Sequence, residues 1–263
     1  MVFDQFLQMN LLKRHPFAVE TFFRQSLVLT FAVPVDQLAA LLPPPLSPDD
    51  FEGRYAFIAV AMVQTEKLRP KGFPRLMGND FFLSGYRIFS RYINQKGKRL
   101  RGLYILESQT DSRQMQWMGN LMTHYNYSLI KVEQHRSDER TGDKDQAEIP
   151  FYEVASPTAG FKVKVRYEDE PALPVGSPFA NWKQARRFAG PLPFTFTYDA
   201  AAGKVLIVEG VRQNWQPRPV AVEEMVLPWL EQQGFGNAVL ASAFVVENIP
   251  YYWKKGIIEN WQP

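Results

Sequence analysis

The chain has 263 residues, of which 46% are hydrophobic and 22% charged, a composition ordinary for a soluble globular protein with a sizeable core. It contains no cysteine, which excludes disulfides, thiol nucleophiles and thiolate metal sites. The 30 Lys and Arg residues oppose 27 Asp and Glu, and the two signs are interspersed, so we expect no nucleic-acid partner.

The first predicted element is a short helix over residues 1–16, ended by Pro16. Polar residues interrupt the apolar core that a signal peptide requires: Asp4, Gln5, Gln8 and Asn10. The longest apolar runs, such as FIAVAMV, are far too short to span a bilayer. We therefore expect a cytoplasmic protein without a membrane partner.

The chain then follows a period of two residues, which is typical of β-strands. Strands are expected over 24–33, 53–68, 81–93 and 100–110, with QKGKR as the turn between the last two. A helical turn or two over VDQLAALLPPP follows the first strand and is ended by its prolines. This pattern predicts an antiparallel meander of long strands.

The period becomes helical over DSRQMQWMGNLMTH, where the recurring apolar residues share one face: Met115, Met118, Leu121 and Met122. Asp111 or Ser112 is a good N-cap for this helix. The methionines most simply belong to the core, although thioethers also suit the wall of an apolar pocket. The stretch YNYSLIKVEQ predicts another strand after the helix.

The second half of the chain predicts further strands over 149–156, 160–169, 194–210 (a hairpin) and 238–253. Short helices are expected over 179–190 and 222–236, and Pro228 either bends the second helix or marks its start. The terminal stretch IPYYWKKGIIENW either docks onto its own sheet or forms a subunit interface, which leaves a homo-oligomer possible.

We expect a single domain over 1–263, in which the helix at 1–16 precedes a β core over 17–263. Hydrophobic strands on both sides of the Pro-rich segment near Pro171 favour one continuous sheet system. The fold class predicted is mainly β, a β-rich α+β arrangement with a large antiparallel barrel or sandwich and a few peripheral helices.

A cluster of polar and aromatic residues surrounds the central helix: Glu107, Asp111, Arg113, His124, Tyr125, Asn126 and Tyr127. Alternate side chains of a strand share a face, so the two tyrosines are expected on one face and His124 with Asn126 on the other. The same rule groups five residues of the preceding strand: Leu103, Ile105, Glu107, Gln109 and Asp111. Both strands become more polar towards the helix, as expected of a barrel end that opens into a cavity.

Each member of the cluster also has a purely structural interpretation. Asp111 would cap the helix, Arg113 would join an ion pair, and His124 would be a core histidine bonded to a carbonyl. Tyr125 and Tyr127 would be ordinary sheet aromatics.

Motifs for other chemistry are absent from the sequence. It has no Gly-rich phosphate loop and no G-x-S-x-G nucleophile elbow, and its three histidines lack the spacing of metal ligands. We therefore expect neither a metal site nor a cofactor.

The stretches TDSRQMQWMGNLMTHYNYSLIKV and FVVENIPYYWKKG resemble the YqjF-like family of uncharacterised conserved proteins. The stretch VPVDQLAALLPPPL adds to this resemblance, which runs from about Phe22 to the C-terminus. The family has no established activity. It is similar in turn to the acetoacetate decarboxylase superfamily, which implies a cone-shaped or barrel-like antiparallel β fold around a closed chamber.

In those decarboxylases, one of two paired lysines forms a Schiff base with the substrate ketone. Alignment from Gly119 places the two lysines at Tyr127 and Ser128, and a shift of one residue reaches Asn126. None of these side chains is an amine, and Lys131, the nearest lysine, has no adjacent ammonium. The resemblance therefore implies a chamber without Schiff-base chemistry.

Together these features predict a protein that binds a small organic ligand, either a carbonyl compound or a carboxylic acid, inside its barrel. The candidate ligand-binding residues are Arg24, Arg87, Asp111, Arg113, Tyr125, Asn126 and Tyr127, with the arginines suited to a carboxylate.

Whether the protein is an enzyme stays open at this point. His124 with Glu107 or Asp111 would supply general acid–base catalysis of a lyase or isomerase type. The alternative is a non-catalytic ligand sensor, carrier or protein-interaction module on a degenerate enzyme scaffold, which the missing lysines favour.

Overall fold

The structure is a computed structural model that describes residues 13–137, 149–190 and 192–262. Most of the helix predicted over 1–16 lies outside the described residues, and residues 13–16 are not helical. Within the described ranges, no helix is both long and apolar enough to cross a membrane.

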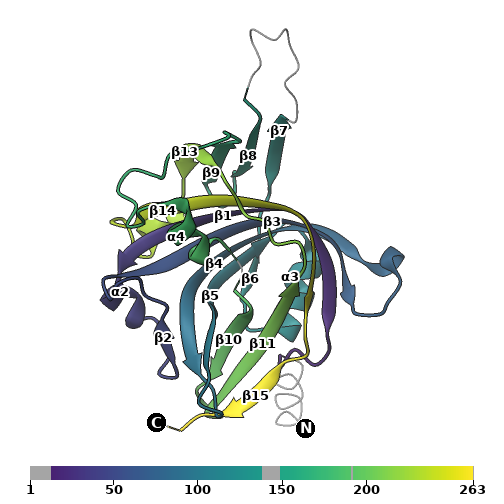
Figure 1. The fold of residues 1–263 in the computed structure, drawn as a ribbon. Helices are drawn as coiled ribbons and strands as arrows, with labels where there is room; N and C mark the ends of the chain where they lie inside the picture. Colours follow the sequence, from purple (N-terminus) through teal and green to yellow (C-terminus); the bar gives the residue numbers. More distant parts are fainter. Residues whose placement is uncertain (1–12, 138–148, 191, 263) are drawn as a thin grey trace.

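Five long strands dominate the larger of two sheets, as the period of two residues predicts: β1 (Val19–Pro34), β3 (Tyr55–Pro70), β4 (Asn79–Ile93), β5 (Arg99–Thr110) and β14 (Val239–Trp253). Shorter strands complete it: β2 (Leu46–Pro48), β6 (Tyr127–Leu129), β10 (Phe194–Asp199), β11 (Lys204–Arg212), β12 (Arg218–Pro219) and β15 (Ile257–Asn260). In Figure 1 β14, β1 and β3 arch across the middle of the molecule, beneath the smaller sheet, and β10, β11 and β15 lie below them.

The large sheet closes into a ring. Its strand order is β12-β14-β1-β3-β4-β5-β10-β11-β15, and β11 pairs a second time with β14, where Gly210–Arg212 face Tyr251–Trp253. The pairings are antiparallel except those of β5 with β6 and β10. The C-terminal strand β15 pairs with β11, so the terminal stretch docks onto its own sheet as the sequence suggests.

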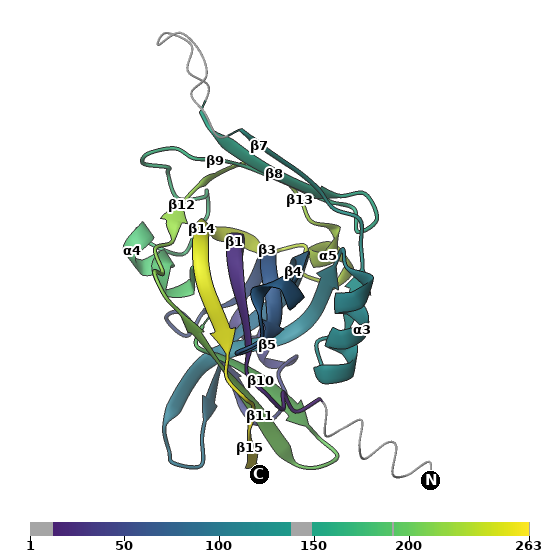
Figure 2. The same cartoon turned by 90° about the vertical axis from the view of Figure 1, so that its right-hand side faces the viewer.

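A second, smaller sheet lies over one face of the ring, whereas one continuous sheet system was expected. It contains β7 (Glu133–Ser137), β8 (Phe151–Ser156), β9 (Phe161–Arg166) and β13 (Ala221–Val226), as Figure 2 shows from the side. The prediction of a helix from 222 was wrong for its first half, which is β13. The helix α5 (Pro228–Gln232) begins at Pro228, since proline suits the first turn of a helix.

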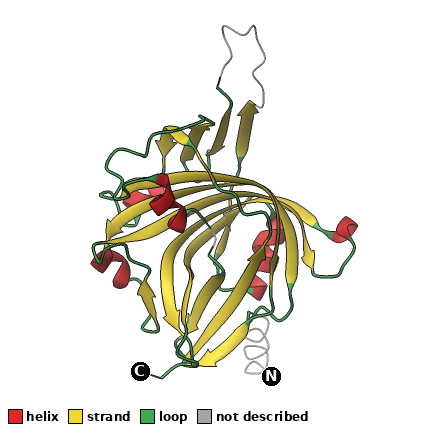
Figure 3. Cartoon of the chain, viewed as in Figure 1, coloured by secondary structure: helices red, strands yellow, loops and turns green. Residues whose placement is uncertain are grey.

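The remaining helices are short and lie outside the sheets, as Figure 3 shows: α2 (Val35–Ala39), η1 (Arg75–Met77), α3 (Arg113–Met122), α4 (Trp182–Ala185) and η2 (Arg186–Phe188). Ser112 caps α3, because its hydroxyl accepts a hydrogen bond of 3.2 Å from the Met115 amide. The predicted mainly β fold with a few peripheral helices is confirmed.

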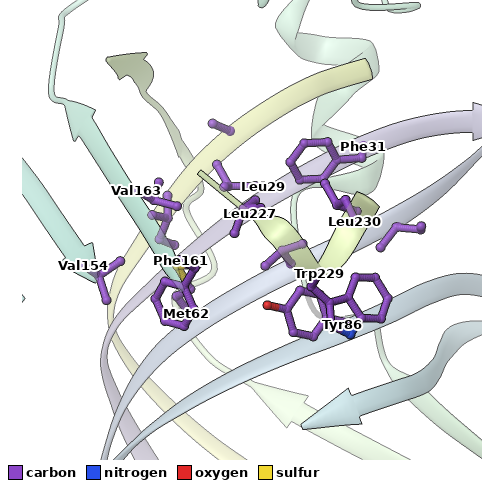
Figure 4. Close-up of a cluster of buried hydrophobic side chains, with 14 of the residues drawn as sticks. Leu29, Phe31, Met62, Tyr86, Val154, Phe161, Val163, Leu227, Trp229 and Leu230 are labelled. Carbon is purple, nitrogen blue, oxygen red and sulfur yellow. The ribbon is translucent and has the colours of Figure 1, made fainter. Parts of the chain in front are cut away.

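A hydrophobic core fills the space between the two sheets. It joins side chains of β1 and β3 to Val154 of β8, Val163 of β9 and the α5 residue Trp229. The Trp229 ring stacks on Tyr86 of β4 with centroids 4.0 Å apart, as Figure 4 shows. Burial of these large rings is a main source of stability, at about 25 cal/mol per Å² of apolar surface.

One irregularity in the ring affects the faces of β5. Tyr86 pairs with Glu107, but the next residue, Arg87, pairs with Ile105, so Leu106 is an extra residue in β5. Such a β-bulge reverses the alternation of side chains on its two sides. Before Leu106 the odd-numbered residues Leu103 and Ile105 face the inside of the ring, whereas after it the even-numbered residue Ser108 does.

Candidate ligand-binding chamber

A cavity of about 300 Å³, which we call the chamber, lies between strands of the ring, helix α3 and residues 15–17. Its wall comes from β1, β3, β4, β5, β14 and α3, and apolar side chains form most of it: Phe23, Val63, Phe81, Leu83, Leu103, Ile105, Met115, Met118, Met122 and Trp253. The described residues of the wall include no Asp, Glu or Lys. A cavity of this size and character suits a small, largely apolar molecule.

Arg87 is the main charged group of the wall. Its Nε is buried and has no hydrogen-bond partner, and no carboxylate among the described residues forms an ion pair with it. Burial lowers the pKa of the Arg87 guanidinium, and three nearby tyrosines oppose this change. Arginine nevertheless stays charged at neutral pH, so the chamber holds a half-buried positive charge without a counter-ion among the described residues.

The three tyrosines Tyr125, Tyr127 and Tyr251 also line the chamber. Burial raises the pKa of Tyr125 well above its usual range and raises that of Tyr127 and Tyr251 to about 12, although Arg87 lowers all three. The hydroxyls therefore keep their protons at neutral pH. Each hydroxyl is therefore available as a hydrogen-bond donor in the chamber.

Two glycines leave the space that these polar side chains occupy. Gly85 and Arg87 lie two residues apart on the same face of β4, and a Cβ on Gly85 would lie 2.9 Å from Nη2 of Arg87. A Cβ on Gly119 in α3 would collide with the Tyr127 ring. The guanidinium and the phenol ring are thus each packed against bare backbone.

The helix α3 holds the short strand β6 through Asn120. Its Nδ2 donates to the Tyr127 carbonyl at 2.9 Å, and its Oδ1 accepts from the Tyr127 amide at 2.7 Å. The side-chain amide of Asn120 thus takes the place of a neighbouring strand by bonding both backbone polar groups of Tyr127, while β5 pairs with β6 on its other side. Sequence reasoning missed Asn120 and Gly119, because neither has a local pattern that reports a contact seven or eight residues away.

Of the residues predicted from sequence, Arg87, Tyr125 and Tyr127 line the chamber. His124 and Asn126 line a second cavity of about 250 Å³ with Tyr104 and Tyr198. The strand expected from Tyr125 is shorter in the structure: residues 124–126 form a bend, Asn126 has a φ of 50°, and β6 begins at Tyr127, so the separation of these side chains is not due to strand alternation. Burial lowers the pKa of His124, as does the nearby charge of Lys13. Only Ile105 and Tyr125 line both cavities and therefore separate them among the described residues.

Glu107 and Asp111 serve the scaffold in this structure. Glu107 accepts hydrogen bonds from Trp229 Nε1 at 2.8 Å and Gln109 Nε2 at 2.9 Å, on the face opposite the chamber. The bulge at Leu106 explains this, because strict alternation would have grouped Glu107 with Ile105, which lines the chamber. Asp111 accepts from the Phe82 amide at 2.8 Å and so joins the end of β5 to β4.

Arg24 and Arg113 lie away from the chamber wall. Arg24 has a half-exposed side chain, pairs with Glu66 at 2.9 Å and also donates to Asn248. Arg113 is exposed at the start of α3. His15, which was not predicted, also lines the chamber, and its Nδ1 is buried without a hydrogen-bond partner. Burial lowers the pKa of the His15 imidazole, although neighbouring backbone groups oppose this change.

The described residues include no group of three or more His, Asp or Glu side chains that could hold a metal ion. The Arg69 guanidinium lines the chamber as well, but it already pairs with Glu20 at 2.7 Å. A half-buried guanidinium without an acidic partner among the described residues, near three phenols, is therefore the chemical feature that distinguishes the chamber.

Most of the chain matches the model of one known protein family. Residues 21–253 match the family DUF2071, described as an uncharacterized conserved protein. The chain belongs to this family. The match confirms the resemblance to uncharacterised conserved proteins that the sequence motifs indicate. No curated protein matches the chain.

Solved structures share the fold at low sequence identity. An acetoacetate decarboxylase-like enzyme from Sphingomonas wittichii RW1 is 12% identical with a TM-score of 0.60, covering 94% of both chains. Acetoacetate decarboxylase from Legionella pneumophila is 11% identical with a TM-score of 0.59, covering 93% of this chain and 88% of that one. The enduracididine biosynthesis enzyme MppR, complexed with pyruvate, is 11% identical with a TM-score of 0.52, covering 92% and 88%. The DUF2071 chain therefore has the acetoacetate decarboxylase-like fold.

Proposed function

We propose that this DUF2071 protein binds a small organic carboxylate non-covalently in the chamber, with Arg87 as the anchor. The observation that carries the proposal is the guanidinium of Arg87, which lines an apolar cavity without a counter-ion among the described residues and whose Nε is buried without a hydrogen-bond partner. An unpaired charge in such surroundings is costly, and a bound carboxylate would offset that cost through charge-assisted hydrogen bonds. The hydroxyls of Tyr125, Tyr127 and Tyr251 would donate to the same anion or to a neighbouring carbonyl.

The structural relative MppR supports a carboxylate as ligand, because pyruvate is one. Covalent imine chemistry is disfavoured for the present chain, since the described chamber wall contains no lysine. The two positions that the resemblance assigns to the decarboxylase lysines are Tyr127, a phenol that keeps its proton, and Ser128, and a shift of one residue reaches Asn126.

If the protein is an enzyme, a lyase or isomerase reaction would use acid–base groups. Tyr125, Tyr127 and Tyr251 are proton donors of the wall near the anchor, and His15 is a neutral imidazole of the same wall. His124 would act only through Tyr125, which borders both cavities, and Glu107 would act only after a rearrangement.

A ligand carrier or sensor is the second candidate. It is favoured by the absence of a carboxylate base among the described wall residues. Turnover that depends on pH through His15 would favour the enzyme, whereas binding without product formation would favour the carrier.

The test of the proposed function is calorimetric titration with a panel of oxo-, hydroxy- and unsubstituted alkyl carboxylic acids, including pyruvate, on the wild type, Arg87→Met and Arg24→Met. We expect at least one carboxylate to bind the wild type and Arg24→Met, and to lose about tenfold or more in affinity to Arg87→Met. Equal binding by all three proteins, or no binding of any carboxylate, would refute the proposal.

A cytoplasmic location, the absence of nucleic-acid and membrane partners, and a possible homo-oligomer remain predictions of the sequence. Size-exclusion chromatography with light scattering would test the last of them.

A further inference from the structure

The charges of the chamber allow one anionic group on the ligand. Arg87 has no acidic partner among the described residues, while Arg69 is occupied by Glu20 and donates to the carbonyls of Phe73 and Lys67. Burial keeps the third basic group, His15, neutral. A second carboxylate on the ligand would therefore be desolvated without a cation to balance it.

The ligand also cannot carry a cation at little cost. The described wall offers no Asp or Glu, so an ammonium would meet only phenols, thioethers and hydrocarbon. Its proximity to Arg87 would add repulsion. The charge pattern thus disfavours amino acids and amines as ligands.

The apolar remainder of the chamber wall favours a ligand whose part away from the carboxylate is apolar. Met115, Met118 and Met122 line the chamber from α3, and Phe81 and Leu83 line it from β4. Methionine side chains are flexible and polarizable, so they adapt to chains or rings of different shape. A polyol or sugar would lose hydration without gaining partners on such a wall.

The volume sets the scale of the ligand. About 300 Å³ corresponds to about ten groups the size of a water molecule, at roughly 30 Å³ each. Pyruvate would leave much of this space empty. An eight-carbon acid has ten non-hydrogen atoms and would fill it.

We propose that the ligand class is the amphiphilic monocarboxylates: one carboxylate at Arg87 and an uncharged alkyl or aryl body against the α3 methionines. This inference rests on the proposed function and narrows it.

The test compares octanoate with three molecules that change one property each. Suberate adds a second carboxylate, 1-octanol removes the charge, and pyruvate removes the apolar body. Calorimetric titration of the wild type is expected to give octanoate an affinity at least tenfold above each of the others. In Arg87→Met, octanoate should lose this advantage, while 1-octanol should bind as it does to the wild type, which also reports an intact chamber.

The outcomes separate this inference from the proposed function. If suberate or pyruvate binds as tightly as octanoate, and Arg87→Met weakens that binding, the ligand class is wrong and the proposed function stands. If no carboxylate binds in a way that depends on Arg87, both are wrong. Loss of 1-octanol binding by Arg87→Met would show that the chamber has collapsed in this variant. Arg87→Lys, which keeps the charge, would then be the test, and it should still bind octanoate more tightly than 1-octanol. Equal binding of the two ligands by Arg87→Lys would overturn the inference.

Discussion

Gly85 and Arg87 lie two residues apart on the chamber face of β4, so the guanidinium extends back over the α-carbon of Gly85. The backbone of Gly85 is part of an extended strand, where an alanine is also accommodated. A methyl group there would act mainly on the position of the guanidinium, because Nη2 and Nε of Arg87 are the atoms nearest to it.

Gly85→Ala is expected to weaken carboxylate binding by about tenfold, since the methyl group would displace the anchor from its place in the chamber. Calorimetric titration with the carboxylate that binds the wild type best measures this loss. Gly236→Ala is the matched control, because its nearest neighbour, Glu231 Cγ, lies 4.0 Å away. Unchanged affinity in Gly85→Ala would contradict the placement of Arg87.

The buried tyrosines predict a loss of stability at high pH. Burial raises the pKa of Tyr127 to about 12 in the folded state, whereas the unfolded chain releases this proton near the ordinary value of 10.0. Above about pH 10 the folded state therefore binds more protons, and its stability falls by up to about 1.4 kcal/mol per pH unit for each such group. Below pH 10 the contribution is fully present.

Tyr127→Phe removes one of these groups, so its free energy of unfolding should fall less steeply between pH 10 and pH 11.5 than that of the wild type. Urea unfolding at fixed pH values measures both slopes. Parallel curves for the two proteins would show that Tyr127 does not titrate differently in the folded and unfolded chains.

At the scale of elements, the contact between α3 and β6 depends on the two hydrogen bonds of Asn120 with the Tyr127 backbone. Asn120→Ala should lower the free energy of unfolding by about 1–3 kcal/mol, because it leaves a partly buried amide and carbonyl unpaired. Chemical denaturation measures this loss. Trp117→Ala on the same helix, with a side chain 69% exposed, should change stability by no more than about 0.5 kcal/mol.

The elements could be predicted from sequence wherever the local period was clear. The long strands and α3 were found because periods of two and 3.6 residues report burial on one face. The prediction of a helix over the stretch from Ala221 failed because the alternation there is weak and the outer side chains are charged. Only pairing with β9 makes this stretch a strand. Propensity is a weak guide where tertiary pairing decides.

The candidate site was only partly predictable for the same physical reason. The structure places Tyr125 and Tyr127 in the chamber and His124 and Asn126 in the second cavity, which is the expected grouping. The reason given for it was wrong, because residues 124–126 form a bend before β6 and do not follow strand alternation. The arginines could not be ranked, since what distinguishes Arg87 from Arg24 is the lack of an acidic partner from a distant strand. Such long-range pairing leaves no trace in a short window of sequence.

At the scale of the whole molecule, Asp49 joins several parts of the chain. Its side chain is fully buried and accepts from Arg91 Nε at 2.6 Å, from Arg101 Nε at 2.6 Å and from Arg187 at 3.5 Å. These arginines come from β4, β5 and η2. One carboxylate therefore holds two strands of the ring and the segment from Arg186 to Phe188 together.

Asp49→Asn keeps the shape of the side chain but removes its charge from among three arginines. We expect a loss of about 2–3 kcal/mol in the free energy of unfolding, less than for a fully buried pair because Arg187 is half exposed. Equilibrium denaturation in urea measures it. Glu52→Gln is the control: it breaks only the exposed ion pair with Arg54 and should lower the free energy of unfolding by less than about 1 kcal/mol. An equally small loss of stability in Asp49→Asn would contradict the role assigned to Asp49.

The extra residue at Leu106 has an electrostatic effect out of proportion to its size. Strict alternation after Ile105 would direct the carboxylate of Glu107 inward, beside the guanidinium of Arg87, instead of towards the Trp229 indole. The protein would then neutralise its own interior cation, and an incoming acid would have to compete with a resident one. The break in alternation between Ile105 and Glu107 thus leaves the guanidinium of Arg87 without an acidic neighbour on β5.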